Sequence, residues 1–414
     1  MPSQLFKPCT RIRALWDGPE KPLIESFVRA LSEAGYAAIT ARGHFRAAKH
    51  FVDWAHRHGT WVRELNEQSL AGFNRHLSRC RCPHYSHTKQ LRVVHGARLF
   101  LTYLQDARII ALRGAKTPVH DPALLSAFCQ WMRRLRGSAD VTLYHYSVYI
   151  RELLRRFGEW PSCFDAHRLR AFVFERSHSW GPTVAQKCTT ALRMFLRFLI
   201  AEGKCGVGLD AAIPTPAHWR LASLPRYLQP EEVERLIASS NQASAVEWRD
   251  RAILLLLARF GLRAGDIVHL RLSDIDWKGA WIHVCGKGLR HTRLPLTQEV
   301  GAAIVTYLKK GRPRTNTDTM FVRRLAPFCA FSSSAVSHIV DKAFRRAGVA
   351  RPSRGAAHLL RHSLATSMLR QGASLEDIAP VLRHRSSETT QIYAKVDIIA
   401  LRQIAQPWPE AQSC

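Results

Sequence analysis

Four short segments toward the C-terminus carry side chains suited to chemistry on a phosphodiester. In "RFGLRAGDI", Arg263 follows an apolar run that ends at Gly261. Lys287 stands between two glycines, and "HLLRHS" places His358 and Arg361 on one face of a predicted helix. Arginine suits phosphate oxygens because its planar fork matches their geometry, while histidine and lysine can transfer protons. These residue types indicate phosphodiester chemistry without a metal ion.

The fourth segment, "LRHRSSETTQIYAK", contains His384 and Tyr393. Taken alone, Tyr393 reads as a packed aromatic at the end of a short amphipathic helix, and the alternative is a nucleophile assisted by His384. An isolated arginine at a helix end is usually a solvated charge, and a lone histidine is usually structural. As an ordered set, "GLRxxD … GKG … HxLRH … H-x8-Y", these residues favour an active site with Tyr393 as its nucleophile.

This ordered set resembles the active site of the tyrosine recombinases, the phage-integrase-like enzymes that break and rejoin DNA. The specific motifs lie between about residues 225 and 407, and the helical region 121–204 is more loosely similar to the family's core DNA-binding domain. By this resemblance Tyr393 is the nucleophile and Asp266 supports the site. The residues that match the family's remaining catalytic groups are Arg263, Lys287, His358, Arg361 and His384.

Two positions depart from the family pattern. Arg383 stands where the family usually has glycine, before the later histidine, and Asp266 stands where Glu is commoner. The first change is expected to alter the local backbone or to add a phosphate contact. Neither change removes a catalytic group, so activity is expected.

The resemblance implies a site-specific recombinase that acts on double-stranded DNA through a 3′-phosphotyrosyl intermediate, for integration, excision or transposition of a mobile element. It implies no cofactor, which agrees with the lack of a GxxxxGK[ST] loop. It also implies a homo-tetramer on DNA, from a monomer or dimer in its absence. The alternatives are relaxation of the type IB topoisomerase kind and a non-catalytic DNA-binding regulator. A metal nuclease would need clustered acids, but Asp274 and Asp276 read as turn and strand-entry residues.

The charge of the chain also predicts a polyanionic partner. Its 414 residues include 61 Lys and Arg against 32 Asp and Glu, a formal net charge of +29. So large a positive field attracts polyanions, and its spread along the chain points to whole domains that face nucleic acid. A membrane surface is the second interpretation, but no single amphipathic helix concentrates the basic residues.

Export and membrane insertion are not expected. Residues 1–14 lack the apolar core of a secretory signal. The longest apolar run, "AILLLLA" at 252–258, is far shorter than the roughly 20 residues that span a bilayer, so it predicts a buried helix. The ten cysteines are irregularly spaced, which favours reduced thiols in a cytoplasm. The resemblance to the recombinases implies a bacterial protein that acts at the nucleoid.

The elements that must position the site are mostly helical. The predicted fold is mainly α with a small antiparallel β-sheet in the C-terminal catalytic domain (α+β), since two β-rich runs flank Lys287. Its predicted parts are an N-terminal helical module for DNA binding or protein interaction (1–115), a core DNA-binding, SAM-like domain (116–207), a proline-rich linker (208–226) and the catalytic domain with a C-terminal tail (227–414). The family implies a C-shaped clamp on DNA. The tail is expected to dock on a neighbouring protomer or on its own domain.

Two further patterns remain open. "GARLFLTYLQDA" and "ALRMFLRFLIAE" share an Arg-apolar-Phe-Leu-x-aromatic-Leu pattern, which indicates either a duplicated helical module or two convergent amphipathic helices. In "CRCPHYSH", Cys80, Cys82, His84 and His87 have residue types that bind zinc. The tight Cys-x-Cys spacing and the internal proline favour a basic loop instead.

Overall fold

The computed structural model of the chain describes residues 20–83, 85, 90–110, 121–177, 181–215, 224–240, 244–286, 291–350, 355–384, 389–396 and 401–402. Lys287, His84, His87 and nearly all of the tail beyond residue 396 lie outside the described residues. Contacts divide the chain into two compact units, one made of residues 1–110 with 223–414 and the other of residues 111–222. Each is described by itself.

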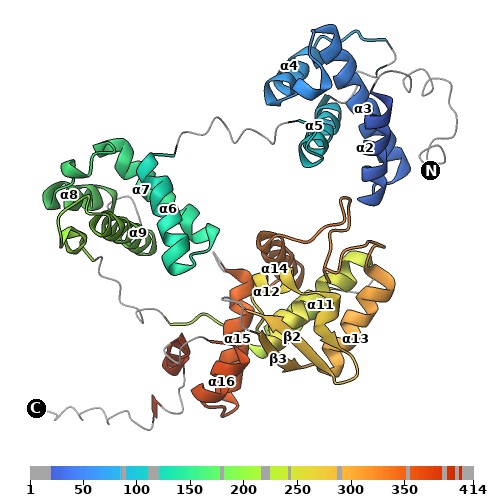
Figure 1. Ribbon diagram of the computed structural model, residues 1–414. Coiled ribbons are helices and arrows are strands. Elements are labelled where there is room, and N and C mark those ends of the chain that lie inside the picture. Colours follow the sequence, from blue (N-terminus) through green and yellow to red (C-terminus); the bar gives the residue numbers. More distant parts are fainter. Residues whose placement is uncertain are drawn as a thin grey trace, which may run out of the picture. The chain divides into compact units, whose positions relative to one another are not determined.

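The N-terminal part of the first unit is a group of helices, drawn in blue in Figure 1. They are α2 (Lys21–Glu33), α3 (Ala38–Arg57), the short 3-10 helix η2 (Val62–Glu64), α4 (Glu67–Leu77) and α5 (Gln90–Asp106). The central helix α3 packs on α2, α4 and α5. The apolar residues at helical spacing on its inner face are all buried: Phe45, Ala48, Phe51, Val52 and Ala55.

The second unit is also helical (Figure 1). Its helices are α6 (Ala123–Arg136), α7 (Asp140–Phe157), η3 (Pro161–Cys163), α8 (Ala166–Ser177), α9 (Pro182–Ala201) and η4 (Leu209–Ala212). Gly137 ends α6 in the left-handed conformation at φ 54°, which glycine adopts without a steric penalty. The first residues of the predicted linker form η4, which packs on α9.

The C-terminal part of the first unit carries the predicted catalytic residues. Its helices are α10 (Pro230–Ala238), α11 (Ala245–Phe260), α12 (Ala264–His269), η5 (Leu272–Asp274), α13 (Gln298–Thr306), the π-helical turn η6 (Tyr307–Gly311), α14 (Ser333–Ala347), α15 (Ala356–Arg370), α16 (Leu375–Val381) and η8 (Gln391–Val396). The run at 252–258 is the buried centre of α11, as predicted. None of the described helices is long and apolar enough to cross a membrane.

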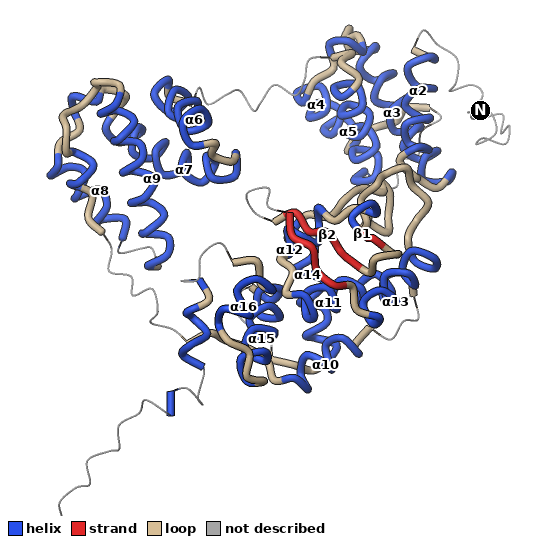
Figure 2. Tube along the Cα trace, turned by 60° about the horizontal axis from the view of Figure 1, so that its bottom comes forward, coloured by secondary structure: helices blue, strands red, loops and turns tan. Residues whose placement is uncertain are grey.

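A three-stranded antiparallel sheet completes this part (red in Figure 2). Its strands are β1 (Ile275–Asp276), β2 (Trp281–Cys285) and β3 (His291–Pro295), in the order β1-β2-β3. Cys285 pairs with His291 at the end of the β2–β3 ladder, so the two strands flank the Lys287 segment as the hairpin signal predicts. The mostly helical fold with a small antiparallel sheet is therefore confirmed.

Candidate active site

The junction of α11 and α12 places the first arginine. Gly261 follows α11 in the left-handed conformation at φ 56°, and a Cβ atom there would lie 2.8 Å from Cδ2 of Leu382. Glycine is therefore required both for the turn and for the close approach. The chain then enters α12 at Arg263, whose backbone N–H donates to Oδ2 of Asp266 at 2.9 Å. This cap holds Arg263 at the start of the new helix.

Arg361 of α15 braces two chain segments. Its side chain is only 4% exposed, and its guanidinium donates to the carbonyl oxygens of Gly261 and Leu382. Burial, followed by the charges of Arg263 and Arg383, lowers the pKa of Arg361 to about 9. The guanidinium therefore stays charged at neutral pH in a place where cations repel one another. Such a fixed, electropositive group is preorganised for an anion.

His358 and Arg263 line a groove of about 540 Å³. Asp266, Gly286 and Ser337 also face this groove. The imidazole of His358 is exposed, yet the surrounding protein atoms and then the charges of Arg361 and Arg263 lower its pKa. The neutral ring can accept a proton. Gly286 lies at this groove and directly precedes Lys287 in the sequence, a lysine outside the described residues.

Tyr393 lies in η8 and is 1% exposed. It packs in a small apolar cluster with Ala365, Ile378 and Leu382. Burial raises the pKa of Tyr393 to about 12, although the charges of Arg361 and Arg263 act in the opposite direction. The phenol is therefore protonated at neutral pH. Tyr393 is a packed aromatic, as its local sequence indicates, and it also lies within the electrostatic reach of both arginines.

His384 lies beside this tyrosine. The two rings are parallel, with centroids 6.4 Å apart, and Nδ1 of His384 lies 2.7 Å from Oγ1 of Thr390. Burial, followed by the charges of Arg361 and Arg263, lowers the pKa of His384 to about 4. The ring is neutral at neutral pH and can donate one hydrogen bond. The structure thus brings together every predicted site residue that it describes.

The carboxylates that a metal nuclease would need have local structural roles. Asp274 accepts the backbone N–H of Arg271 at 2.8 Å, and Asp276 accepts those of Lys278 and Gly279. The Asp274 bond caps η5 ahead of β1, and the Asp276 bonds close the turn that leads from β1 into β2. The interpretation of both aspartates as turn and strand-entry residues is confirmed.

Comparisons with sequence relatives show the family of this chain. Residues 226–398 match the model of the phage integrase family. The putative integrase/recombinase y4rA of Sinorhizobium fredii is 35% identical over 406 residues, which cover 96% of each chain. The chain belongs to the phage integrase family. The tyrosine recombinase XerD of Listeria innocua is 27% identical to this integrase over 266 residues, 63% of this chain and 87% of XerD.

Solved recombinase structures share the fold of this integrase. XerH, a site-specific recombinase bound to its palindromic difH substrate in a post-cleavage complex, has a TM-score of 0.56 at 18% identity, over 67% of this chain and 83% of XerH. A lambda integrase dimer bound to a core site has a TM-score of 0.52 at 19% identity, over 70% of this chain and 98% of that one. Together with the family match and the similarity to XerD, the shared fold identifies the integrase as an enzyme of the tyrosine recombinase type.

One residue at the centre of the integrase site was missed from the sequence. His362 of α15 places Nδ1 2.9 Å from the phenolic oxygen of Tyr393. Burial and the nearby His358 and Arg361 lower the pKa of His362. The signal was present, because His362 ends the "HxLRH" motif four residues after His358 and therefore lies on the same helix face.

Arg383 explains how this integrase replaces the family glycine. Its backbone is left-handed at φ 54°, a conformation that glycine adopts freely and that costs other residues about 1–2 kcal/mol. Its buried guanidinium donates from Nη2 to Oδ2 of Asp266 at 2.9 Å. Among the described residues, its Nε and Nη1 have no hydrogen-bond partner. Arg383 thus adopts a glycine-type backbone conformation, and its guanidinium pairs with Asp266.

Proposed function

We propose that this integrase cuts and rejoins double-stranded DNA at specific sites through a 3′-phosphotyrosyl intermediate on Tyr393. The observation that carries the proposal is the convergence of Tyr393, Arg361 and Arg263, which come from three separate segments of the chain and interact electrostatically. XerH, which shares the fold, was solved with its DNA substrate after cleavage. Integration, excision and transposition of a mobile element are the reactions that such chemistry serves.

The first step exchanges one phosphodiester for another. The phenolic oxygen of Tyr393 forms a bond to the scissile phosphorus, the bond to the 5′ oxygen breaks, and the phenolic proton leaves. Arg263 and Arg361 stabilise the charge that grows on the non-bridging oxygens, a contribution that usually dominates such catalysis. His384 donates a further hydrogen bond. Lys287, which lies outside the described residues, protonates the departing 5′ oxygen.

Burial of Tyr393 opposes loss of its phenolic proton, which activation of the nucleophile requires. A pKa of about 12 means that full ionisation of Tyr393 at pH 7 costs about 7 kcal/mol, at 1.36 kcal/mol per unit. We therefore infer that the proton leaves as the new bond forms, with His358 as its acceptor. His362 orients the phenol through its Nδ1 contact. Because Tyr393 is 1% exposed, DNA binding has to bring its hydroxyl to the phosphate.

Rejoining reverses these bonds. The 5′ hydroxyl of another strand attacks the phosphotyrosyl phosphorus, the bond to Tyr393 breaks, and the phenol recovers a proton. The phosphotyrosyl link conserves the energy of the original bond, so neither ATP nor a metal ion is required for the chemistry. We propose that four copies cooperate on DNA in this exchange.

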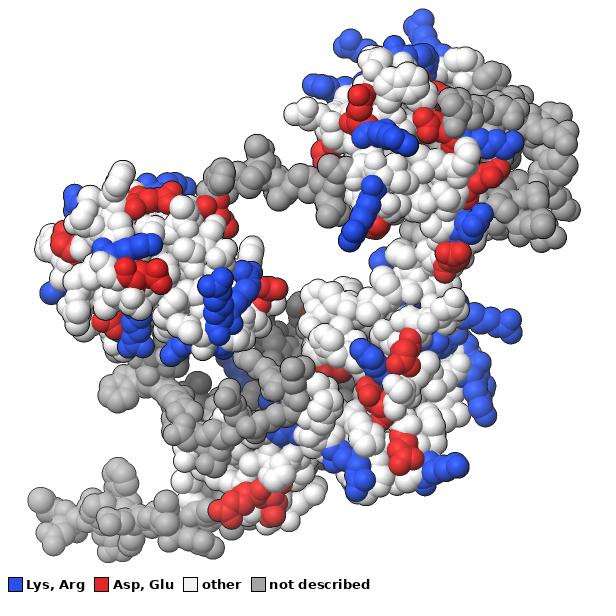
Figure 3. All heavy atoms as spheres, in the orientation of Figure 1, with Lys and Arg blue, Asp and Glu red and all other residues white. Residues whose placement is uncertain are grey.

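The DNA partner is supported by the charge of the chain. The net charge is +29, and Figure 3 shows Lys and Arg distributed over the visible face of the described parts. We propose that the two N-terminal helical regions and the catalytic region clamp the duplex, as part of a reaction at the bacterial nucleoid. Binding should weaken steeply with salt, because contact with many phosphates releases counterions.

Trapping of the covalent intermediate tests the proposal. Nicked suicide DNA that carries the ends of the element should yield a covalent protein–DNA band, and Tyr393→Phe should abolish it. Tyr103→Phe is the matched control, because this phenol donates to Ser26 in the N-terminal helices, outside the proposed site. A band that persists in Tyr393→Phe would overturn the nucleophile. If the wild type relaxes arbitrary supercoiled DNA as fast as DNA that carries its cognate site, a topoisomerase would be favoured.

A further inference from the structure

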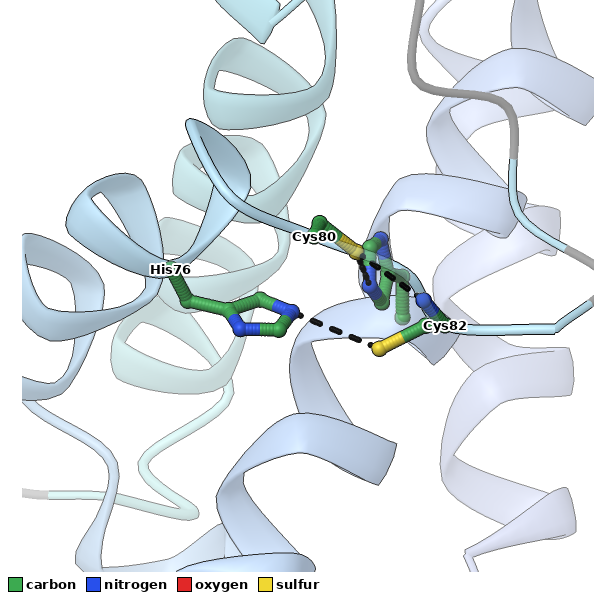
Figure 4. A group of neighbouring side chains, drawn as sticks. His76, Cys80 and Cys82 are labelled. Carbon is green, nitrogen blue, oxygen red and sulfur yellow. Dashed lines mark hydrogen bonds between the residues drawn. The ribbon is translucent and has the colours of Figure 1, made fainter.

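A second cluster of reactive side chains lies in the N-terminal helices. His50 belongs to α3 and His76 to the last turn of α4, while Cys80 and Cys82 follow α4 (Figure 4). The ligand atoms of these four residues all lie within 4.8 Å of one another. None of them takes part in the proposed DNA chemistry.

The distances in this cluster match those around one tetrahedral ion. Sγ of Cys80 lies 3.5 Å from Nε2 of His50, and Sγ of Cys82 lies 3.4 Å from Nε2 of His76. In tetrahedral zinc sites, Zn–S bonds of about 2.3 Å and Zn–N bonds of about 2.0–2.1 Å set neighbouring S and N atoms about 3.6 Å apart. The two pairs therefore already have the separation that a shared zinc ion imposes.

The donor set and its burial select the kind of ion. His50 is 1% exposed, Cys80 and Cys82 are buried, and His76 is half-buried. Two sulfur and two nitrogen donors favour zinc over magnesium or calcium, which prefer oxygen. Structural zinc sites are closed by four protein ligands, whereas catalytic sites keep a position open. Four protein donors in a buried position thus fit a structural site.

The surroundings suit two thiolates. Nη2 of Arg57 donates to Sγ of Cys82 at 2.9 Å, and the backbone N–H of Cys82 donates to Sγ of Cys80 at 3.4 Å. Both sulfur atoms therefore accept hydrogen bonds, as metal-bound thiolates do. The ring of Tyr85 stacks on His50 with centroids 4.0 Å apart, and its hydroxyl donates to Asp53 of α3. These contacts hold the imidazole in place, as outer groups around metal ligands commonly do.

We propose that His50, His76, Cys80 and Cys82 bind one structural zinc ion. The proposal goes beyond DNA recombination and does not depend on it. Binding replaces the two thiol protons, which are released to solvent, and yields a site with no net charge from metal and ligands. The ion ties the segment that follows α4 to the central helix α3. This link gives the N-terminal helices a crosslink between residues far apart in sequence.

Metal analysis of the purified full-length protein, without a histidine tag, tests the site. The wild type should contain one zinc per chain. Cys80→Ser, Cys82→Ser and His76→Ala should each lose most of it. Cys329→Ser should keep it, because this thiol is exposed and far along the chain from the cluster. The double variant His84→Ala with His87→Ala should also keep it, which distinguishes the proposed ligands from those nearest in sequence.

Measurements on the wild type keep the test independent of variant folding. Cobalt-substituted protein should absorb in the visible, with sulfur-to-cobalt charge transfer, and the Cys80 and Cys82 thiols should react with maleimide only after a chelator removes the ion. Folded wild-type protein without zinc that gives no cobalt spectrum would overturn the proposal. A disulfide between Cys80 and Cys82 would do the same. Loss of zinc in the His84 and His87 double variant, with retention in His76→Ala, would overturn the ligand set. None of these measurements requires recombination activity.

Discussion

The catalytic cluster around Arg361 and the Cys–His cluster around Cys80 differ in the charge that each one needs. Burial, followed by neighbouring arginines, lowers the pKa of Arg361, His358 and His384, so the catalytic cluster disfavours further positive charge. The Cys–His cluster instead offers two sulfur atoms that accept hydrogen bonds. The catalytic cluster is therefore suited to bind an anion, and the Cys–His cluster is suited to bind a cation.

This difference shows that clustered histidines do not by themselves indicate a function. In the catalytic cluster burial, followed by the nearby cations, lowers the pKa of the histidines and keeps them neutral, which suits proton transfer and hydrogen bonding to phosphate. In the Cys–His cluster the imidazole nitrogens face sulfur, which suits a soft metal ion. The groups that share the cluster with the histidine decide between these roles. Variants in the catalytic cluster should therefore leave zinc content unchanged, and variants in the Cys–His cluster should leave the chemistry of covalent complex formation unchanged.

After Tyr393→Phe, the substitution expected to slow covalent complex formation most is Arg361→Lys. A lysine cannot donate to both Gly261 and Leu382 while it presents a planar fork to phosphate. Covalent complex formation on suicide DNA should slow by about 10²–10³-fold, the usual cost of one preorganised donor. Zinc content should not change. Arg345→Lys is the matched control on the exposed surface of α14, and an equal loss in that variant would contradict the assignment.

A smaller effect is expected from Arg383→Gly. The variant relieves a left-handed arginine, a gain of about 1–2 kcal/mol, but leaves Asp266 without its ion-pair partner, a loss of about 3–5 kcal/mol. The free energy of unfolding should therefore fall by about 2 kcal/mol in denaturant titrations.

The double variant of Arg383→Gly with Asp266→Glu restores the commoner family pair. Its loss of stability should be smaller than the sum of the two single losses, because the positions are in direct contact. Strictly additive losses would show that the Arg383–Asp266 pair does not compensate for the missing glycine.

The parts of the molecule that sequence predicted are those encoded locally. The end of α11 at Gly261 and the pairing of the two strands that flank Lys287 each follow from a few adjacent residues. The family motif also pointed to the residues that the proposed mechanism uses, because they occur in a fixed order along the chain. The predicted domain boundaries remain predictions. The same holds for a duplicated helical module, which was suggested by the sequence pattern shared by α5 and α9.

Contacts between distant residues were not predictable in the same way. The bond from His362 to Tyr393 spans 31 positions, and that from Arg383 to Asp266 spans 117. His50 lies 30 positions before Cys80, so local spacing pointed to the nearer His84 and His87 instead. Which of two buried side chains meet depends on how whole helices pack, and spacing along one segment does not contain that information.

Two substitutions test whether His362 positions the phenol of Tyr393 through a hydrogen bond. His362→Leu removes the contact with the phenol of Tyr393, whereas His362→Gln can retain a hydrogen bond. Loss of one such bond, about 1 kcal/mol, should slow covalent complex formation about 5-fold in the leucine variant. The glutamine variant should remain near the wild-type rate. Equal rates in the wild type and the leucine variant would show that His362 does not position the nucleophile.

The smallest expected effect is a dependence of stability on pH that differs between the two clusters. The folded-state pKa of His384, about 4, lies below its ordinary value of about 6.5, so the unfolded chain binds the proton more readily. Stability from this residue is complete above pH 6.5 and is lost as pH falls toward 4. For a half-buried ring, the loss by pH 5 should be about 1 kcal/mol.

Added anions and added metal ions should show which cluster causes the loss of stability at acid pH. Pyrophosphate in the catalytic groove should offset the acid loss, because an anion favours protonated His384, and His384→Gln should flatten the pH profile. Zinc should not replace pyrophosphate in this effect, since protons and zinc compete for the ligands of the other cluster. Denaturant titrations at pH 7 and pH 5, with each addition, measure both effects. Rescue by zinc and not by pyrophosphate would assign the acid loss to the Cys–His cluster and contradict the assignment to His384.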